Sequence, residues 1–146
     1  MKKTASQRLQ TVLKIAQLRE RAAAEKLAVS IRNVDAVSQQ QQQLEQYKNE
    51  YNDHFQALGA QGQSVGQLSN FIRFYSSLDG AAVAQGQRLA LAQDQRDAAS
   101  KLWRQQYSRQ KNMQKLVEKK QQQEQCEQDN KAQREQDDRK YTPLLI

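Results

Sequence analysis

An apolar or small residue recurs at every seventh position from Leu9 to Leu58, over seven consecutive intervals without a slip. A repeat of seven residues keeps one face of an α-helix turned toward a partner helix, so it predicts a coiled coil rather than a globular core. The companion positions, four residues further on, are apolar at both ends and polar in places between them. The expected seam of this first helix is Leu9, Ala16, Ala23, Ser30, Val37, Leu44, Tyr51 and Leu58 with Leu13, Glu20, Leu27, Val34, Gln41, Lys48 and Phe55.

A second pair of seven-residue series follows, and it predicts a second long helix. Between the two helices, Gly59, Gly62 and Gly66 fall within eight residues, a composition that favours a turn and can supply positive φ. Each helix then has its only partner in the other. The second seam comprises Tyr75, Ala82, Leu89, Arg96, Trp103, Gln110 and Val117 with Phe71, Leu78, Gln85, Ala92, Ala99, Gln106 and Met113.

The fold class predicted is therefore all-α, a long antiparallel two-helix coiled-coil hairpin that forms one domain over residues 1–146. We expect a helix over about 5–58, a turn over about 59–67, a helix over about 68–139 and a flexible tail at 140–146. Gly80 and Gly86 fall inside the second helix, where each costs about 1 kcal/mol relative to Ala. They mark a tolerated weakness, a close approach to the facing helix, or a bend.

Composition excludes several classes of protein. Only 37% of the residues are hydrophobic and the mean hydropathy is -1.02, which suits a thin fold better than a globular core. Charged residues interrupt every apolar run, so neither a signal peptide nor a membrane span is expected. His54 has no nucleophile nearby, and Cys126 has no second cysteine. We expect no enzyme activity, no cofactor and no metal site.

Charge is unevenly distributed along the chain. Residues 1–35 hold eight Lys or Arg against three acids, and residues 101–146 hold eleven against seven. Residues 36–70 hold one Lys against three acids. In a hairpin the first and last segments lie side by side, so the sequence predicts one positive end and one nearly neutral, aromatic tip.

Matched residue spacings occur on both sides of the expected turn. Gln40, Leu44, Tyr47 and Tyr51 share the offsets 0, 4, 7 and 11 with a set in the second helix. Tyr47 and Phe74 lie outside the seams, so this surface is either a widened local core or a contact patch. We call it the tip stripe, and it comprises Gln40, Leu44, Tyr47, Tyr51, Phe74, Leu78, Ala81 and Gln85.

Three segments in this order resemble the FliJ family of the bacterial flagellar type III export apparatus. They are LEQYKNEY from Leu44, FYSSLDGAAVAQ from Phe74 and the tryptophan-basic KLWRQQYSRQKNMQKL from Lys101. The resemblance covers nearly the whole chain and implies a hairpin similar to the coiled coil of the rotary ATP synthase γ subunit. It departs at Gln85, where the family can have a histidine, and at the final residues 141–146.

The resemblance also implies three partners and a location. These are the ring of the export ATPase FliI, the export-gate membrane protein FlhA, and empty export chaperones. The family's gate-binding residues correspond to the tip stripe, and the protein would be cytoplasmic, peripheral at the inner membrane through the gate. At the basic end, we expect contact with the ATPase ring through Arg8, Lys14, Arg19, Arg104, Arg109 and Lys115.

Two other functions remain open from the residues alone. A generic scaffold coiled coil could pair with a second copy through its seams. A basic coiled coil could bind nucleic acid, since Lys101 to Lys120 holds seven Lys or Arg against one Glu. Aromatic residues interleave poorly with these charges and no nucleic-acid module is recognisable, so binding to nucleic acid is not expected.

Overall fold

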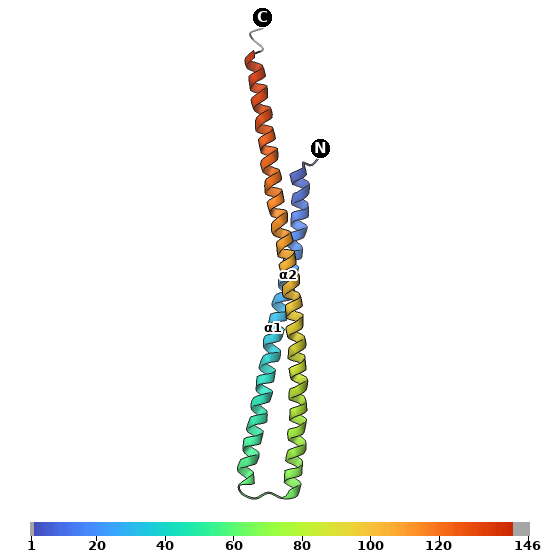
Figure 1. The fold of residues 1–146 in the computed structure, drawn as a ribbon, viewed down its shortest axis with the longest axis vertical. Helices are drawn as coiled ribbons and strands as arrows, with labels where there is room; N and C mark the ends of the chain where they lie inside the picture. Colours follow the sequence, from blue (N-terminus) through green and yellow to red (C-terminus); the bar gives the residue numbers. More distant parts are fainter. Residues whose placement is uncertain (1, 142–146) are drawn as a thin grey trace. The chain divides into compact units, whose positions relative to one another are not determined.

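Two long helices make up the fold, α1 over Ala5–Gly59 and α2 over Val65–Tyr141 (Figure 1). The structure is a computed structural model that describes residues 2–141. The chain divides into two compact units: unit 1 joins the residues up to Ala23 with those from Trp103 on, and unit 2 spans Ala24–Leu102. Within each unit a stretch of α1 packs antiparallel against a stretch of α2. The predicted all-α two-helix hairpin is confirmed.

Both helices begin with the same local arrangement. The Thr4 hydroxyl accepts a hydrogen bond from the Gln7 N–H (3.3 Å), and the Gln7 side-chain oxygen accepts one from the Thr4 N–H (3.0 Å). Ser64 and Gln67 repeat this exchange at 3.2 and 3.0 Å. Each pair is a capping box, which satisfies N–H groups that a helix start leaves without partners. Because Ser64 caps α2, the helix begins at Val65, three residues before the expected start.

The turn between the helices depends on one of the three glycines. Gly62 has a φ of 85°, a backbone conformation that residues with a Cβ atom rarely adopt. Its N–H donates to the Gly59 carbonyl at 3.1 Å, and the Gln61 N–H donates to the Leu58 carbonyl at 3.0 Å. Gly59 is the last residue of α1, and Gly66 lies inside α2. The turn is therefore shorter than the predicted 59–67.

Burial follows the predicted seams closely. All the predicted seam residues are buried or half-buried except Leu58, which is 41% exposed because it lies one residue from the end of α1. The core is a thin line of mostly small side chains. Its buried apolar members are Ala23, Val34, Leu78, Ala82, Ala92 and Val117.

Polar residues at seam positions have specific partners. In unit 1, the Trp103 Nε1–H donates to the Glu20 carboxylate at 2.9 Å. In unit 2, Lys48 pairs with Asp79, and this hydrogen bond raises the pKa of the lysine above its usual value. Glu20 and Lys48 thus each have a polar partner on the facing helix.

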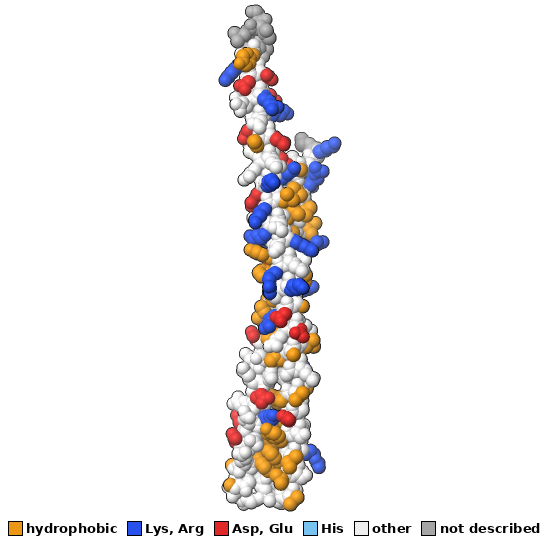
Figure 2. Space-filling model, viewed as in Figure 1, with side chains coloured by type: hydrophobic (Ala, Val, Ile, Leu, Met, Phe, Trp, Pro, Cys, Tyr) orange, Lys and Arg blue, Asp and Glu red, His pale blue; other side chains and the backbone are white. Residues whose placement is uncertain are grey.

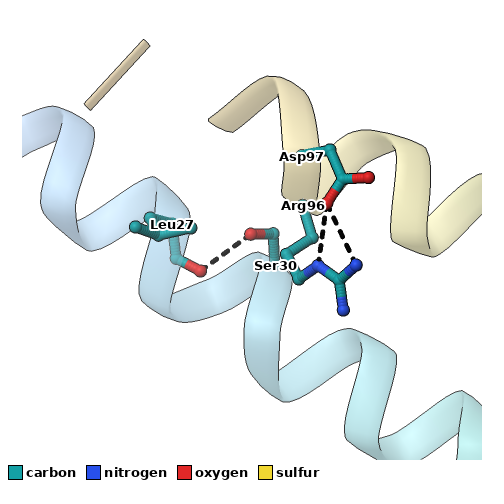
Figure 3. Close-up of polar contacts among 4 residues, drawn as sticks. All are labelled: Leu27, Ser30, Arg96 and Asp97. Atoms are coloured by element: carbon teal, nitrogen blue, oxygen red, sulfur yellow. Dashed lines mark hydrogen bonds and ion pairs between the residues drawn. The ribbon is translucent and has the colours of Figure 1, made fainter. Parts of the chain in front are cut away.

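Two further polar seam residues bond within their own helices (Figure 3). The Ser30 hydroxyl donates to the Leu27 carbonyl at 2.7 Å. The Arg96 guanidinium turns along α2 to Asp97, with Nε and Nη2 at 3.1 and 3.0 Å from one carboxylate oxygen. These bonds give both polar side chains a partner within their own helix.

In unit 1, α2 extends past the start of α1. The Glu124 carboxylate accepts hydrogen bonds from the Ser6 hydroxyl (2.6 Å) and the Ser6 N–H (3.0 Å), which lower the pKa of Glu124. Every residue of 125–141 is exposed, yet the helix continues to Tyr141. Of the expected flexible tail at 140–146, the first two residues therefore belong to α2, and 142–146 lie outside the described residues.

Gly80 and Gly86 show no close approach to the facing helix. A Cβ atom at Gly80 would have nothing within 4 Å, and one at Gly86 would be 4.0 Å from Gln41 Nε2, an ordinary contact. Both glycines lie inside α2 and neither has a positive φ. The space at both positions favours a tolerated weakness over a required close approach.

We therefore expect Gly80→Ala and Gly86→Ala each to raise the free energy of unfolding by about 1 kcal/mol, the difference in helix propensity. Gly62→Ala is the matched control, because its positive φ should make the same substitution destabilising. Urea denaturation followed by circular dichroism measures all three. Destabilisation by alanine at position 86 would restore the close-approach interpretation.

Candidate functional site

The tip stripe lies entirely in unit 2, where it divides into two halves. Its four seam residues are buried or half-buried: Leu44, Tyr51, Leu78 and Gln85. Its four remaining residues are exposed: Gln40, Tyr47, Phe74 and Ala81. The two halves touch, because Phe74 packs edge-on against Tyr51 with ring centroids 4.7 Å apart. The stripe is therefore a surface strip supported by the seam, rather than a set of equally available residues.

A cluster of aromatic rings supports the stripe. Phe71 stacks on Phe55 with ring centroids 3.5 Å apart, and it also stacks on Tyr51 at 5.3 Å and on Tyr75 at 5.6 Å. The cluster joins both helices near the turn. Large aromatic rings contribute much buried area and prefer a few relative orientations, so the cluster fixes the rotation of α1 against α2. This fixes the positions of the exposed residues beside it.

Tyr47 is the most available anchor in the stripe. Half of it is exposed, against 40% for Phe74, and within residues 2–141 it forms no ring pair. The structure therefore gives Tyr47 little part in the core. Figure 2 shows hydrophobic side chains gathered at the end of unit 2 that holds the turn. Exposed apolar residues flanking the turn are Leu58, Val65, Leu68, Ile72 and Phe74.

Gln85 has a structural role inside the stripe. It is only 8% exposed, and its side-chain amide donates to the Val37 carbonyl at 3.3 Å and to the Gln40 side-chain oxygen at 3.1 Å. A buried amide with partners is not available to a ligand without breaking those bonds. The sequence assigned Gln85 both to the second seam and to the tip stripe, and its burial agrees with the seam position.

The second candidate surface is the basic end, in unit 1. Its six predicted residues are all exposed: Arg8, Lys14, Arg19, Arg104, Arg109 and Lys115. Residues 1–23 and 103–120 together hold twelve Lys or Arg and two Glu. One of these acids, Glu20, bonds to Trp103. Figure 2 shows Lys and Arg side chains crowding this part of the surface, which makes it attractive to an anionic partner.

The described part of the chain offers little support for a catalytic site, a metal site or a membrane span. His54 and Cys126 are exposed, and no group of three His, Cys, Asp or Glu in residues 2–141 could hold a metal ion. Among the same residues, no helix has the length and apolar character needed to cross a membrane.

Comparison with known protein families identifies a relationship along the chain. The model of a protein family described as "FliJ: Flagellar FliJ protein" matches residues 5–140, nearly the full length of both helices. No curated protein and no solved structure matches the chain.

Proposed function

Since the chain belongs to the FliJ family, whose members are components of the flagellar export apparatus, we propose that it is a non-enzymatic, cytoplasmic protein that links the export ATPase to the export gate. The exposed half of the tip stripe is the observation that carries this proposal. Tyr47 and Phe74 present aromatic surface to solvent on a base that the ring cluster holds in place. Aromatic anchors of this kind dominate many protein interfaces.

The gate protein FlhA is the partner we assign to the tip stripe. The contact would place the protein peripherally at the cytoplasmic face of the membrane. Charges are sparse among residues 36–70, so binding there would rest on apolar contact and would depend weakly on salt. This expected salt independence separates the tip stripe from the basic end.

The basic end is the surface we assign to the ring of the export ATPase FliI. Its six exposed cations lie on both helices of unit 1, so a ring that encloses the coiled coil would meet positive charge on more than one side. Charge complementarity of this kind speeds association more than it tightens the final complex. Export chaperones are the third proposed partner, without an assigned surface.

Reversing two charges at the basic end tests the assignment to the ATPase. We expect Lys14→Glu with Lys115→Glu to slow association with the purified ATPase by about tenfold at low salt, because electrostatic steering is lost. Helix content should not change, since exposed charges contribute little to folding. Stopped-flow fluorescence at two salt concentrations measures the rate.

The matched control is the double reversal Arg73→Glu with Arg88→Glu, at two exposed arginines of unit 2. It should leave association unchanged. Equal slowing by both doubles would indicate a general charge effect and remove the assignment. Salt-sensitive binding of single-stranded DNA, lost in the first double, would instead favour the nucleic-acid function that the twelve basic residues make conceivable.

A further inference from the structure

An open groove lies between the helices of unit 1. It has a volume of about 400 Å³, and its apolar rim residues Val12, Ile15 and Leu116 are 44%, 46% and 45% exposed. These three side chains border one groove instead of being scattered singly over the surface, and apolar residues gathered in this way can mark a contact surface. We call this the unit 1 groove, and it is lined by Val12, Ile15, Ala16, Arg19, Gln106, Arg109, Asn112, Met113 and Leu116.

The groove is open because of two seam residues. Ala16 occupies a seam position of α1 with only a methyl group, and Gln106 occupies a seam position of α2 with a polar side chain. Neither fills the space between the helices as a leucine would. The longer residues Val12, Ile15 and Leu116 therefore line the sides of the space instead of closing it.

Its shape fits a helix. On the α1 side the groove is lined by Val12, Ile15 and Arg19, which are three and four residues apart. On the α2 side its lining extends from Gln106 to Leu116. Ten residues of helix span about 15 Å, so the walls are between two and three turns long. A helix laid into such a trough would insert apolar residues spaced three and four apart.

The positive charge around the groove favours acidic residues on the part of the bound helix that does not enter the groove. Arg19 and Arg109 line the groove itself, and residues 1–23 and 103–120 together carry twelve Lys or Arg against two Glu. A ligand with an apolar face and a basic remainder would be repelled. A ligand with an apolar face and acidic flanks would gain both the burial and the charge attraction.

The chain itself offers no such helix within the described residues. The acidic face of α1 around Glu45, Glu50 and Asp53 is otherwise lined by Gln and Asn. Beyond Glu124, the only apolar residues of α2 are Cys126, Ala132 and Tyr141, which do not share one face.

A second copy of the chain is disfavoured as the occupant, because its matching groove carries the same excess of positive charge.

We propose that the unit 1 groove binds the apolar face of an acidic amphipathic helix supplied by another protein. The site is additional to the proposed function and independent of it, since its anchors are uncharged aliphatic residues rather than the cations assigned to the ATPase ring. Arg19 and Arg109 belong to both surfaces, so the test below substitutes neither of them.

The probe is a fluorescein-labelled, acidic helical peptide with leucines at positions i, i+3, i+4 and i+7 and glutamates elsewhere. Fluorescence anisotropy with the full-length protein measures its affinity. We expect Ile15→Ser with Leu116→Ser to weaken binding at least tenfold, because both anchors lie on the groove. The control double Leu18→Ser with Leu102→Ser, at exposed leucines outside the groove, should bind like wild type.

A second variant fills the groove instead of making it polar. Ala16→Leu should weaken peptide binding without lowering the melting temperature, because it adds apolar volume to the open seam. The Lys14 and Lys115 reversal should affect the ATPase more than the peptide, so each proposal can fail without the other.

Several results would overturn the inference. These are no binding of the peptide to wild type, equal loss in both serine doubles, and equal binding of a scrambled peptide of the same composition, which would reduce the effect to charge. Self-association that sedimentation detects in wild type and not in the Ile15 and Leu116 double would assign the groove to a second copy.

Discussion

Tyr47→Ala is expected to weaken binding to the export gate about 30-fold, which corresponds to about 2 kcal/mol, while helix content and melting temperature stay close to wild type. The reason lies in its surroundings. Tyr47 is 50% exposed, lies outside the seams and is not part of the ring cluster, so the folded chain loses little when the ring is removed. Isothermal titration with the soluble part of FlhA measures the affinity, and circular dichroism measures the melting temperature.

Tyr107→Ala is the matched control, because Tyr107 is a 42% exposed tyrosine of unit 1, away from the tip stripe. It should leave gate affinity unchanged. Phe74→Ala should also weaken gate binding, but with some loss of stability, since Phe74 packs against Tyr51. A strong fall in melting temperature for Tyr47→Ala, with affinity unchanged, would show that the stripe is a widened local core.

The heptad predicted the fold well because it records the strongest constraint on this chain. Apolar residues that repeat every seven positions form a narrow face that another helix can cover. The glycine-containing turn allows the second helix of the same chain to fold back onto this face. Residues as polar as Glu20 and Lys48 were placed correctly on the seam by position alone. Leu58 is the predicted seam residue that is exposed. The seven-residue repeat does not indicate where the packing between the two helices ends.

Partners across the seam could not be predicted from the heptad. The bonds of Trp103 to Glu20 and of Lys48 to Asp79 depend on the axial register of the two helices. That register depends on the turn, whose length the sequence overestimated. The capping boxes at Thr4 and Ser64 were not predicted either, although Ser or Thr followed three residues later by Gln is a sequence signal for a helix start.

The candidate site was only half predictable for a related reason. Spacing grouped eight residues into the tip stripe and the heptad placed Gln85 on the seam, but neither could predict that the Gln85 amide donates to the Val37 carbonyl and to the Gln40 side chain. The unit 1 groove was not foreseen, because Ala16 and Gln106 fit the heptad as ordinary seam residues. A groove arises from missing volume, and the volume left between two helices depends on which side chains meet.

Phe71→Ala should have the largest effect on stability, lowering the free energy of unfolding by about 3 kcal/mol. Phe71 stacks on Phe55, Tyr51 and Tyr75, so its removal leaves three rings without their common neighbour. Such ring pairs contribute about 0.5–1.5 kcal/mol beyond the area that they bury. Urea denaturation followed by circular dichroism gives the free energy, and hydrogen exchange of unit 2 locates the loss.

Ile72→Ala provides the control for Phe71→Ala, because Ile72 is the next residue of α2 and is 58% exposed. It should cost about 0.5 kcal/mol or less. Among the seam residues near the turn that are not aromatic, Leu58 is exposed and Lys48 is charged, so few positions there could replace the rings as a source of buried area. A loss below about 1 kcal/mol for Phe71→Ala, close to that of Ile72→Ala, would mean that the turn and its caps hold the helices together without the cluster. The tip stripe would then lose the rigid support on which its role as a binding surface depends.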